Sequence, residues 1–265
     1  MLSPEHLETY LRRAAMLGRE TVEAPPFVCF FSPGDPLRFF NYAKPLHPVG
    51  AERDDLTEAL MALRTAFRVR GRMPRFEFIE EYAPDLGSAL LAAGFSLEAR
   101  YPLLVCTPET LRPGPPINGL TITTLTPDSP AEDLLSCLTV QREGFGEIAG
   151  DPPTQVDVDD LRANLAEDGA FLARMDGVPA GAMMYTAPSD GLTELAGGTT
   201  IEAYRRRGIG AAMIAAAAAA AFARGVEIAF LTAASEYASG VFQRAGFQPY
   251  GTALAYFEEQ ESTVA

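Results

Sequence analysis

The sequence is poor in residues that bind metals or form disulfides. It contains two histidines, His6 and His47, and three cysteines, Cys29, Cys106 and Cys137. No C-x-x-C pair and no cluster of cysteine with histidine occurs, so the spacing of a zinc site is missing. We therefore predict no metal ion. An odd number of unclustered cysteines also suits a reducing compartment, so the simplest localisation is cytoplasmic.

Positive charge and long apolar runs are scarce as well. The formal net charge is −14, whereas nucleic-acid binding needs a basic surface. The N-terminal residues are charged and lack the apolar stretch of a secretory signal. The longest apolar run is rich in alanine and ends at Arg224, so it is too weakly hydrophobic to span a membrane. We predict neither a nucleic acid nor a membrane as partner.

A proline-rich stretch, TPETLRPGPPING at residues 107–119, divides the 265-residue chain. Its four prolines and two glycines make regular structure there improbable. We predict one domain at residues 1–108, a second at 119–258 and a tail at 259–265. The hydrophobic share of 48% is sufficient for a sizeable core.

The second half alternates between strand and helix patterns. Asp176-Gly177 stands between two apolar runs, which predicts a tight β-hairpin. Asp128-Ser129 is a helix-capping signal, and Gly246 is typical of a helix C-terminus. Strands are expected at residues 119–126, 192–201, 226–234 and 248–257, with the hairpin at 170–187. Helices are expected at residues 128–146, 154–169 and 235–247, and in the alanine-rich stretch before 225.

The first half contains a copy of part of the second. Residues 75–105 align with residues 227–257 without a gap, and the Gly-Phe pair at 94–95 falls on the one at 246–247. Both segments read as strand, helix, Gly-Phe and strand, which indicates a repeated unit. The alternative is that any two such segments look alike.

Residues 203–225, AYRRRGIGAAMIAAAAAAAFARG, begin a helix without the usual Ser, Thr, Asp or Asn cap. Open backbone N–H groups, the partial positive charge of a helix N-terminus and approachable glycines make an anion site. The P-loop pattern is absent, and Met213 replaces the third glycine of a dinucleotide-binding fingerprint. The remaining pattern is R-x-x-G-x-G, formed by Arg205, Gly208 and Gly210.

This pattern resembles the pyrophosphate-binding motif Q/R-x-x-G-x-G/A of the GCN5-related N-acetyltransferases, the GNAT family. VFQRAGF at residues 241–247 is similar to the family's fourth helix, which ends in Gly-Phe. The resemblance covers roughly residues 119–257. It implies an α/β fold with two GNAT-like domains, each a mixed, mostly antiparallel central sheet flanked by helices. At residues 53–58 the first copy has no glycine where the motif stands in the second, so we expect it to be degenerate and without cofactor.

The resemblance implies acetyl-CoA, or another acyl-CoA, as cofactor. The backbone amides from Arg206 to Ala211 would hold the pyrophosphate, and the strand before them would pair with the pantetheine. A backbone N–H near Thr200 would polarise the thioester carbonyl, and Gly197-Gly198 would permit a bulge there. The residues expected to contact the cofactor are Thr199, Thr200, Ile201, Arg205, Arg206, Arg207, Gly208, Ile209, Gly210, Ala211, Ser235 and Phe242.

Glu194 is the expected catalytic base, because amine acetylation needs a neutral amine. By the period of two it shares a strand face with Ala196, Gly198 and Thr200. It stands eleven residues before Arg205, which is similar to the distance in the histone-acetylating branch of the family. The alternative is a solvated carboxylate with no catalytic part. Weaker candidates for substrate contact are Glu143, Glu147 and Asp151.

Phe242 departs from the family, because many members carry a tyrosine there that protonates the leaving thiolate. We predict transfer of an acetyl group from acetyl-CoA to a primary amine of unknown identity by direct attack in a ternary complex. The alternatives are a non-catalytic acyl-CoA-binding or interaction module, and an enzyme for longer acyl chains. The expected partners are a small-molecule or peptide amine acceptor and, in addition, a second copy of the chain in a homodimer.

Overall fold

The computed structural model describes residues 2–49, 56–146 and 151–258. The chain divides into two compact units, Met1–Leu103 with Gly251–Ala265, and Leu104–Tyr250. The domain boundaries expected from the sequence stay a prediction, and the expected tail at 259–265 lies outside the described residues. Within the described part of the chain, no helix has both the length and the apolar character needed to cross a membrane.

Over the residues that the structure describes, the first unit contains three α-helices, a short 3-10 turn and the strands β1 to β4, and it shares β5 and β11 with the second unit. In chain order these are α1 (Pro4–Met16), β1 (Glu20–Ala24), β2 (Phe27–Phe31), η1 (Arg38–Phe40), β3 (Tyr42–Pro45), α2 (Thr57–Arg68), β4 (Arg75–Ile79), α3 (Leu86–Ala92), β5 (Ser96–Cys106) and β11 (Gln248–Phe257).

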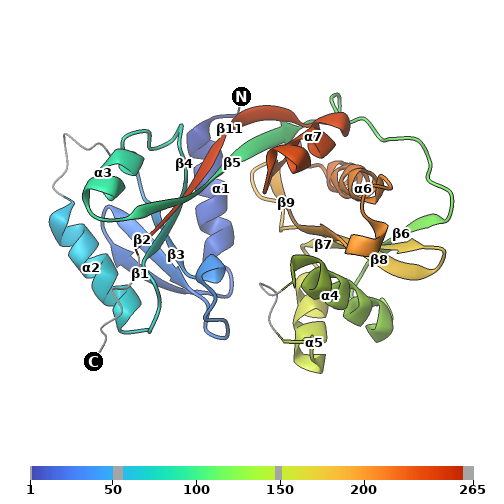
Figure 1. The fold of residues 1–265 in the computed structure, drawn as a ribbon, viewed down its shortest axis with the longest axis horizontal. Coiled ribbons are helices and arrows are strands. Elements are labelled where there is room, and N and C mark those ends of the chain that lie inside the picture. Colours follow the sequence, from blue (N-terminus) through green and yellow to red (C-terminus); the bar gives the residue numbers. More distant parts are fainter. Residues whose placement is uncertain (1, 50–55, 147–150, 259–265) are drawn as a thin grey trace. The chain divides into compact units, whose positions relative to one another are not determined.

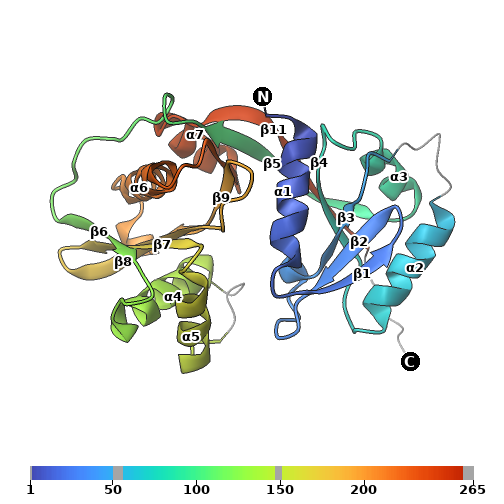
Figure 2. The same ribbon diagram turned by 180° about the vertical axis from the view of Figure 1, so that it is seen from behind.

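Helices cover both faces of this sheet, as Figure 2 shows for α1 and α2. Val28 and Phe30 of β2 lie in one core cluster with Ala15 of α1. On the opposite face the ring of Phe31 lies 4.8 Å from the ring of Phe67 in α2. Every residue of β2 is buried, as expected for a strand covered on both faces.

A buried ion pair joins α1 to the ends of β3 and β4. Glu8 of α1 is fully buried, and its Oε1 lies 3.0 Å from Nζ of Lys44, the single lysine of the sequence. The other carboxylate oxygen accepts a hydrogen bond from the backbone N–H of Ile79 at 3.0 Å. One turn further along α1, Arg12 donates to the carbonyl of Pro45 at 2.9 Å. Two side chains of α1 therefore bridge the ends of two strands that run parallel.

In its described residues the second unit contains the strands β6 to β10, four α-helices and a short 3-10 turn. In chain order these are β6 (Leu120–Leu125), α4 (Ala131–Phe145), α5 (Gln155–Asn164), β7 (Gly169–Met175), β8 (Val178–Tyr185), β9 (Leu192–Thr200), η3 (Glu202–Tyr204), α6 (Ile209–Ala223), β10 (Ile228–Thr232) and α7 (Glu236–Arg244).

Its two cores lie on opposite faces of the sheet, with α6 on one face and α4 and α5 on the other (Figure 1). Ala217, Ala218 and Ala221 of α6 have no exposed surface. Alanine has both a high helix propensity and a small side chain, so this helix packs closely on the strands beneath it. The alanine run therefore forms a helix that packs on the core of this unit.

The predicted hairpin is confirmed, because Asp176 and Gly177 have positive φ angles of 50° and 83° between β7 and β8. The capping signal predicted for α4 is wrong. The cap position is Pro130, and Ser129 Oγ instead accepts from the backbone N–H of Thr126 at 2.8 Å. The following helix, α5, does have a side-chain cap, a capping box formed by Thr154 with Asp157.

The strands hydrogen-bond in the order β1-β2-β3-β4-β11-β5-β10-β9-β8-β7-β6. The α/β class and the mixed sheet flanked by helices are confirmed, but the prediction of a separate sheet in each domain is wrong. The reason lies in the last strand of each repeat. Within the first unit β11 pairs with β4, from Ala253↔Ile79 to Phe257↔Arg75. Within the second unit, the end of β5 lies next to β10.

The repeat seen in the sequence is present in the structure. The gap-free alignment places β4 on β10, α3 on α7 and β5 on β11. Gly94 and Gly246, which follow the two helices, both adopt positive φ, at 91° and 100°. The two segments are therefore copies of one strand–helix–strand unit.

Candidate functional site

The loop before α6 has an unusual backbone. Arg206 and Gly208 both lie in the left-handed region, with φ of 63° and 83°. Gly208 occupies the cap position of α6, and no side chain caps the helix there. Successive backbone N–H groups in such a turn point into a shared concavity that suits an anion. The open N-terminus expected from the sequence is thus present.

Gly208 is restricted by its surroundings as well as by its backbone. A Cβ added there would lie 3.1 Å from Cδ1 of Ile117, which belongs to the proline-rich linker. At Gly210 an added Cβ would have ordinary contact, 3.9 Å from Oγ1 of Thr200. Of the two glycines, Gly208 is the one whose position requires glycine.

Two of the three arginines hold the loop itself. Arg205 donates through Nε to the carbonyl of Thr200 at 3.0 Å and through Nη2 to the carbonyl of Gly144 at 3.3 Å. Arg207 donates to the carbonyl of Ala203 at 3.2 Å and lies over the ring of Tyr204. The contacts of Arg205 fix the loop to β9 and to α4. Arg206, the third arginine, has the left-handed backbone described above.

β9 carries the predicted bulge at Gly197-Gly198. The register on either side is Met184↔Ala196 and Ala182↔Thr199, which leaves Met183 alone opposite the two glycines. Gly197 has a positive φ of 63°, and a side chain at Gly198 would collide with Met183. The backbone favours glycine at the first position, and the side chain of Met183 would have to move to admit a larger residue at the second.

The bulge changes which residues of β9 share a face. Ala196 and Thr199 pair with residues two apart on β8, so these two lie on the same face as Glu194. Thr200 therefore lies on the opposite face. The prediction that Glu194, Ala196, Gly198 and Thr200 share one face is wrong, because the extra residue of the bulge shifts the alternation by one.

Glu194 is half-buried and stands where β9 and β10 stop pairing. The parallel ladder runs from Leu192↔Ile228 to Glu194↔Phe230. After this pair β9 continues for six residues beside β8 alone, as far as the described residues show. The face of Glu194 is the one covered by α4, because Ala182 and Met184, on that face, belong to the core that contains Leu134.

α4 contributes two residues that the sequence analysis missed. Gln141 donates through Nε2 to the carbonyl of Gly197 at 3.2 Å. A Cβ added at Gly144 would collide with Oγ1 of Thr199, so the backbone of α4 touches β9 there. A signal was present in the sequence: a glycine inside a helix costs about 1 kcal/mol relative to alanine and marks a close approach. Gln141 stands one turn before it on the same side.

The remaining predicted residues have the following positions. Ser235 caps α7, since its Oγ accepts from the backbone N–H of Ala238 at 3.2 Å. Phe242 is half-buried against the core of α6. Glu143 is exposed on α4, and Asp151 accepts through its carbonyl from Arg142. Glu147 lies outside the described residues.

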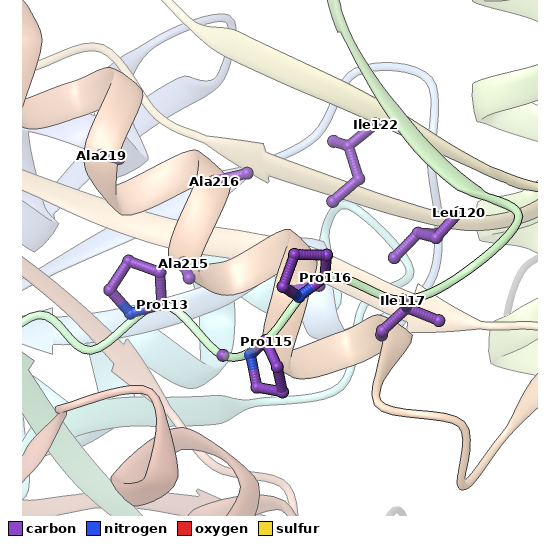
Figure 3. A pocket seen from close by; sticks show the side chains of 11 residues that line it. Pro113, Pro115, Pro116, Ile117, Leu120, Ile122, Ala215, Ala216 and Ala219 are labelled. Atoms are coloured by element: carbon purple, nitrogen blue, oxygen red, sulfur yellow. The ribbon is translucent and has the colours of Figure 1, made fainter.

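A hollow of about 380 Å³ flanks α6, beside the linker (Figure 3). Linker prolines lie beside the alanines of the helix, and Leu120 and Ile122 of β6 complete the lining. Ile117 belongs to this hollow and also contacts the position of Gly208. The linker therefore forms part of the wall next to the loop.

All three cysteines are buried and free. Burial raises the pKa of Cys29 and of Cys137 to about 12, and it raises the pKa of Cys106 as well. A thiol with such a pKa stays protonated near neutral pH, and the thiolate is the nucleophilic form. The cysteines are therefore poor candidates for carrying an acyl group.

The comparison with protein families agrees with this geometry. Residues 134–247, which contain most of α4 together with the bulge, the loop and α7, match the model of the acetyltransferase (GNAT) family. This part of the chain belongs to the GNAT family. The matched segment is thus of the GNAT N-acetyltransferase type, and that family typically uses acetyl-CoA.

Solved structures extend the GNAT likeness over nearly the whole chain. A GCN5-related N-acetyltransferase from Kribbella flavida is 28% identical, with a TM-score of 0.81 over 99% of this chain and 98% of that one. A tandem GNAT protein from the clavulanic acid biosynthesis pathway is 14% identical, with a TM-score of 0.61 over 88% of this chain and 78% of that one.

A GCN5-related N-acetyltransferase from Sphaerobacter thermophilus is also 14% identical, with a TM-score of 0.65 over 88% of this chain and 80% of that one. These last two likenesses concern the fold alone. None of the curated proteins compared with the chain matches it.

Proposed function

We propose that the second unit transfers an acetyl group from acetyl-CoA to a primary amine by direct attack. The observation that carries this proposal is the uncapped, left-handed loop at the start of α6, adjoining the end of the bulged strand β9, inside the segment that matches the GNAT family. An anion site beside β9, which stops pairing with β10 after Glu194, suits a ligand with a pyrophosphate and an extended arm.

In this proposal the backbone amides from Arg206 to Ala211 hold the pyrophosphate. Thr199, Thr200 and Ile201 lie at the end of β9 and accompany the pantetheine arm, with Ser235 and Phe242 on the side of α7. Gly208 lets the pyrophosphate reach the helix N-terminus, because this cap residue has no side chain that would cover the N–H groups of α6. The roles of these residues rest on the family resemblance and on the loop geometry together.

Glu194 is the proposed base. Its carboxylate takes a proton from the ammonium form of the acceptor, directly or through water, and the neutral nitrogen then attacks the thioester carbon. A C–N bond forms and the C–S bond breaks. The second N–H proton leaves the nitrogen, and the departing CoA sulfur takes up a proton. The products are the N-acetylated amine and CoA thiol. Direct attack is favoured because the cysteines are buried and protonated.

The proposal is tested by incubating the protein with acetyl-CoA and a panel of amines that includes aminoglycosides, polyamines and short peptides. Release of CoA thiol and an amine heavier by one acetyl group support it. Mass spectrometry of CoA species that copurify with the protein reports the acyl chain. Binding of acetyl-CoA without turnover of any amine would favour a non-catalytic acyl-CoA-binding module, which Phe242 also suggests.

Phe242→Tyr is expected to raise turnover by roughly tenfold to a hundredfold, the lower range of general-acid effects. The added hydroxyl would supply the proton donor that many family members have at this position. Phe242 is half-buried, so the hydroxyl has room for a partner. Steady-state turnover on the best amine of the panel measures the effect.

The control for this variant is Phe222→Tyr, because Phe222 is also half-buried against the same core but lies near the end of α6. It is expected to leave turnover unchanged. An inert Phe242→Tyr would contradict the missing-acid interpretation. A slower enzyme would mean that the ring lies in a dry environment, where an unpaired hydroxyl costs about 1–3 kcal/mol.

The first unit is expected to bind no acyl-CoA. Its parallel strands β3 and β4 correspond to β9 and β10, but the carboxylate of Glu8 bonds Lys44 and the N–H of Ile79 at their ends. Placing an acyl arm there would expose or break a buried ion pair, which costs about 3–5 kcal/mol when one partner is left alone.

Isothermal titration with acetyl-CoA is therefore expected to saturate at one molecule per chain. The second unit should account for all of the bound acetyl-CoA, so a Gly208→Asp variant should show no saturable binding. Two equal sites in the wild type, or one remaining site in the variant, would show that the first unit also binds the cofactor.

A further inference from the structure

Two side chains near the contact between α4 and β9 hydrogen-bond to backbone carbonyls of the strand. Gln141 holds the carbonyl of Gly197 at 3.2 Å. The guanidinium of Arg205 links the carbonyl of Thr200 to that of Gly144, at 3.0 Å and 3.3 Å. These side chains thus engage two carbonyls of β9, one at the bulge and one at the end of the strand.

The direction of the other backbone groups of β9 follows from the pairing with β8. The carbonyl of Glu194 accepts from the N–H of Thr186 at 3.0 Å, so the backbone groups of Glu194 point towards β8. The N–H of Ile201 donates to the carbonyl of Ala180 at 2.9 Å, so Ile201 also points towards β8. In a strand this direction alternates from one residue to the next.

Glu194 and Ile201 both point towards β8, but they are an odd number of residues apart, which strict alternation does not allow. The alternation is therefore interrupted once between them, at the bulge. The pairing therefore directs the N–H groups of Gly197 and Thr200 and the carbonyls of Gly198 and Thr200 away from β8, and it leaves the direction of the peptide between Gly197 and Gly198 unset. We call these three residues the open edge of β9. It is the edge along which β10 has stopped pairing.

Gln141 and Arg205 engage two of the three carbonyls of the open edge. A carbonyl facing a developing oxyanion would destabilise it, whereas an N–H would stabilise it. Holding the carbonyls of Gly197 and Thr200 on the α4 side fixes the two peptide planes. The N–H of Gly198 then points away from Gln141, because the C=O and N–H of one trans peptide are opposed, and the N–H of Thr200 points away from β8 through the pairing of its neighbours.

We propose that Gln141 is a positioning residue for acetyl transfer, which orients the bulge so that an N–H of the open edge meets the thioester carbonyl, with Arg205 as the second anchor. The inference rests on the proposed function of the site. It also assigns the guanidinium of Arg205 to the two carbonyls, in contrast to its expected contact with the cofactor.

The test uses full-length protein and acetyl-CoA labelled with ¹³C at the thioester carbonyl. A hydrogen bond to this carbonyl moves its ¹³C resonance downfield relative to free acetyl-CoA. In Gln141→Met, which keeps the length of the side chain and removes the donor, the bound resonance is expected to move back towards the free value. Turnover on an amine is expected to fall roughly tenfold to a hundredfold, somewhat below the loss of an oxyanion donor itself. Acetyl-CoA affinity by calorimetry should change little.

Gln155→Met is the matched control, since Gln155 is exposed on α5 and bonds Asp159 on its own helix. It should leave the resonance and turnover unchanged. Gln141→Glu is a second variant of nearly identical shape, and it should reproduce the effect of Gln141→Met if the donor is what matters. An unchanged bound resonance in both Gln141 variants would overturn the positioning role, and so would a loss of affinity equal to the loss of turnover.

The outcome is separable from the proposed function. If the wild type binds no acetyl-CoA, calorimetry alone shows that the proposed function is wrong. If it binds acetyl-CoA and the resonance does not respond to Gln141, the proposed function stands and the positioning role fails. Circular dichroism melting of each variant shows that it is folded when measured.

Discussion

Gly208→Asp is expected to abolish acetyl-CoA binding while the protein stays folded. The carboxylate would stand at the cap of α6, in the place proposed for the pyrophosphate, and it would repel the phosphates and occupy the backbone N–H groups. Its Cβ would also press on Ile117, 3.1 Å away. Losing two hydrogen bonds to a charged group, at about 1.5–3 kcal/mol each, weakens binding at least roughly a hundredfold.

Two further variants separate charge from backbone strain. Gly208→Asn has the same shape without the charge, and it should weaken binding less than Gly208→Asp. Gly225→Asp places the same residue at the other end of α6, where φ is 88° and an added Cβ meets nothing within 4 Å. Isothermal titration should give wild-type affinity for that variant. Unchanged affinity in Gly208→Asp would refute the pyrophosphate assignment.

Glu194→Gln is expected to lower turnover by roughly 10²-fold or more, the size of a general-base contribution, with little change in acetyl-CoA affinity. The amide keeps the shape of the side chain and its place on the α4 face of β9, but it cannot take a proton. The defect should shrink as the pH rises, because more of the acceptor amine is then already neutral. The measurement is kcat against pH for both proteins.

Glu227→Gln is the control for this variant. Glu227 is exposed directly before β10, in the same unit, and this variant should keep the wild-type pH profile. A defect of Glu194→Gln that is equal at every pH, or no defect, would rule out Glu194 as the base. Glu143, exposed on α4, would then be the next carboxylate to substitute.

Much of the second unit could be predicted because its signals are local. The turn at Asp176-Gly177, the alanine-rich helix and the glycine pair of the bulge each act within a few residues, and all of them are where the sequence places them. The uncapped start of α6 was predictable for the same reason, because the sequence has glycine, and not Ser, Thr, Asp or Asn, at the cap position.

The face of Thr200 could not be predicted in the same way. A period of two holds only while every residue of a strand pairs, and one extra residue reverses the sides of everything after it. The direction of the Arg205 guanidinium was equally hidden, because its partners are backbone carbonyls that any sequence would offer. Such contacts depend on which helix lies beside which strand.

The buried pair of Glu8 and Lys44 left no signal in the sequence. A carboxylate on an amphipathic helix normally faces water, and here it is fully buried because the ends of β3 and β4 supply an ammonium group and a backbone N–H. The exchange of last strands between the two copies was hidden too. Both copies have the same strand pattern, so the sequence does not specify that β11 pairs with β4 and β5 with β10.

The place of β11 has a consequence for how the protein is made. β4 pairs with a strand that ends at Phe257, so during synthesis the sheet of the N-terminal unit is complete only after the second unit and β11 have been made. Until then β4 presents an unpaired edge, the kind of surface through which partly folded chains associate. Directly after β11, the ion pair between Arg64 and Glu258 joins α2 to the final residue that the structure describes.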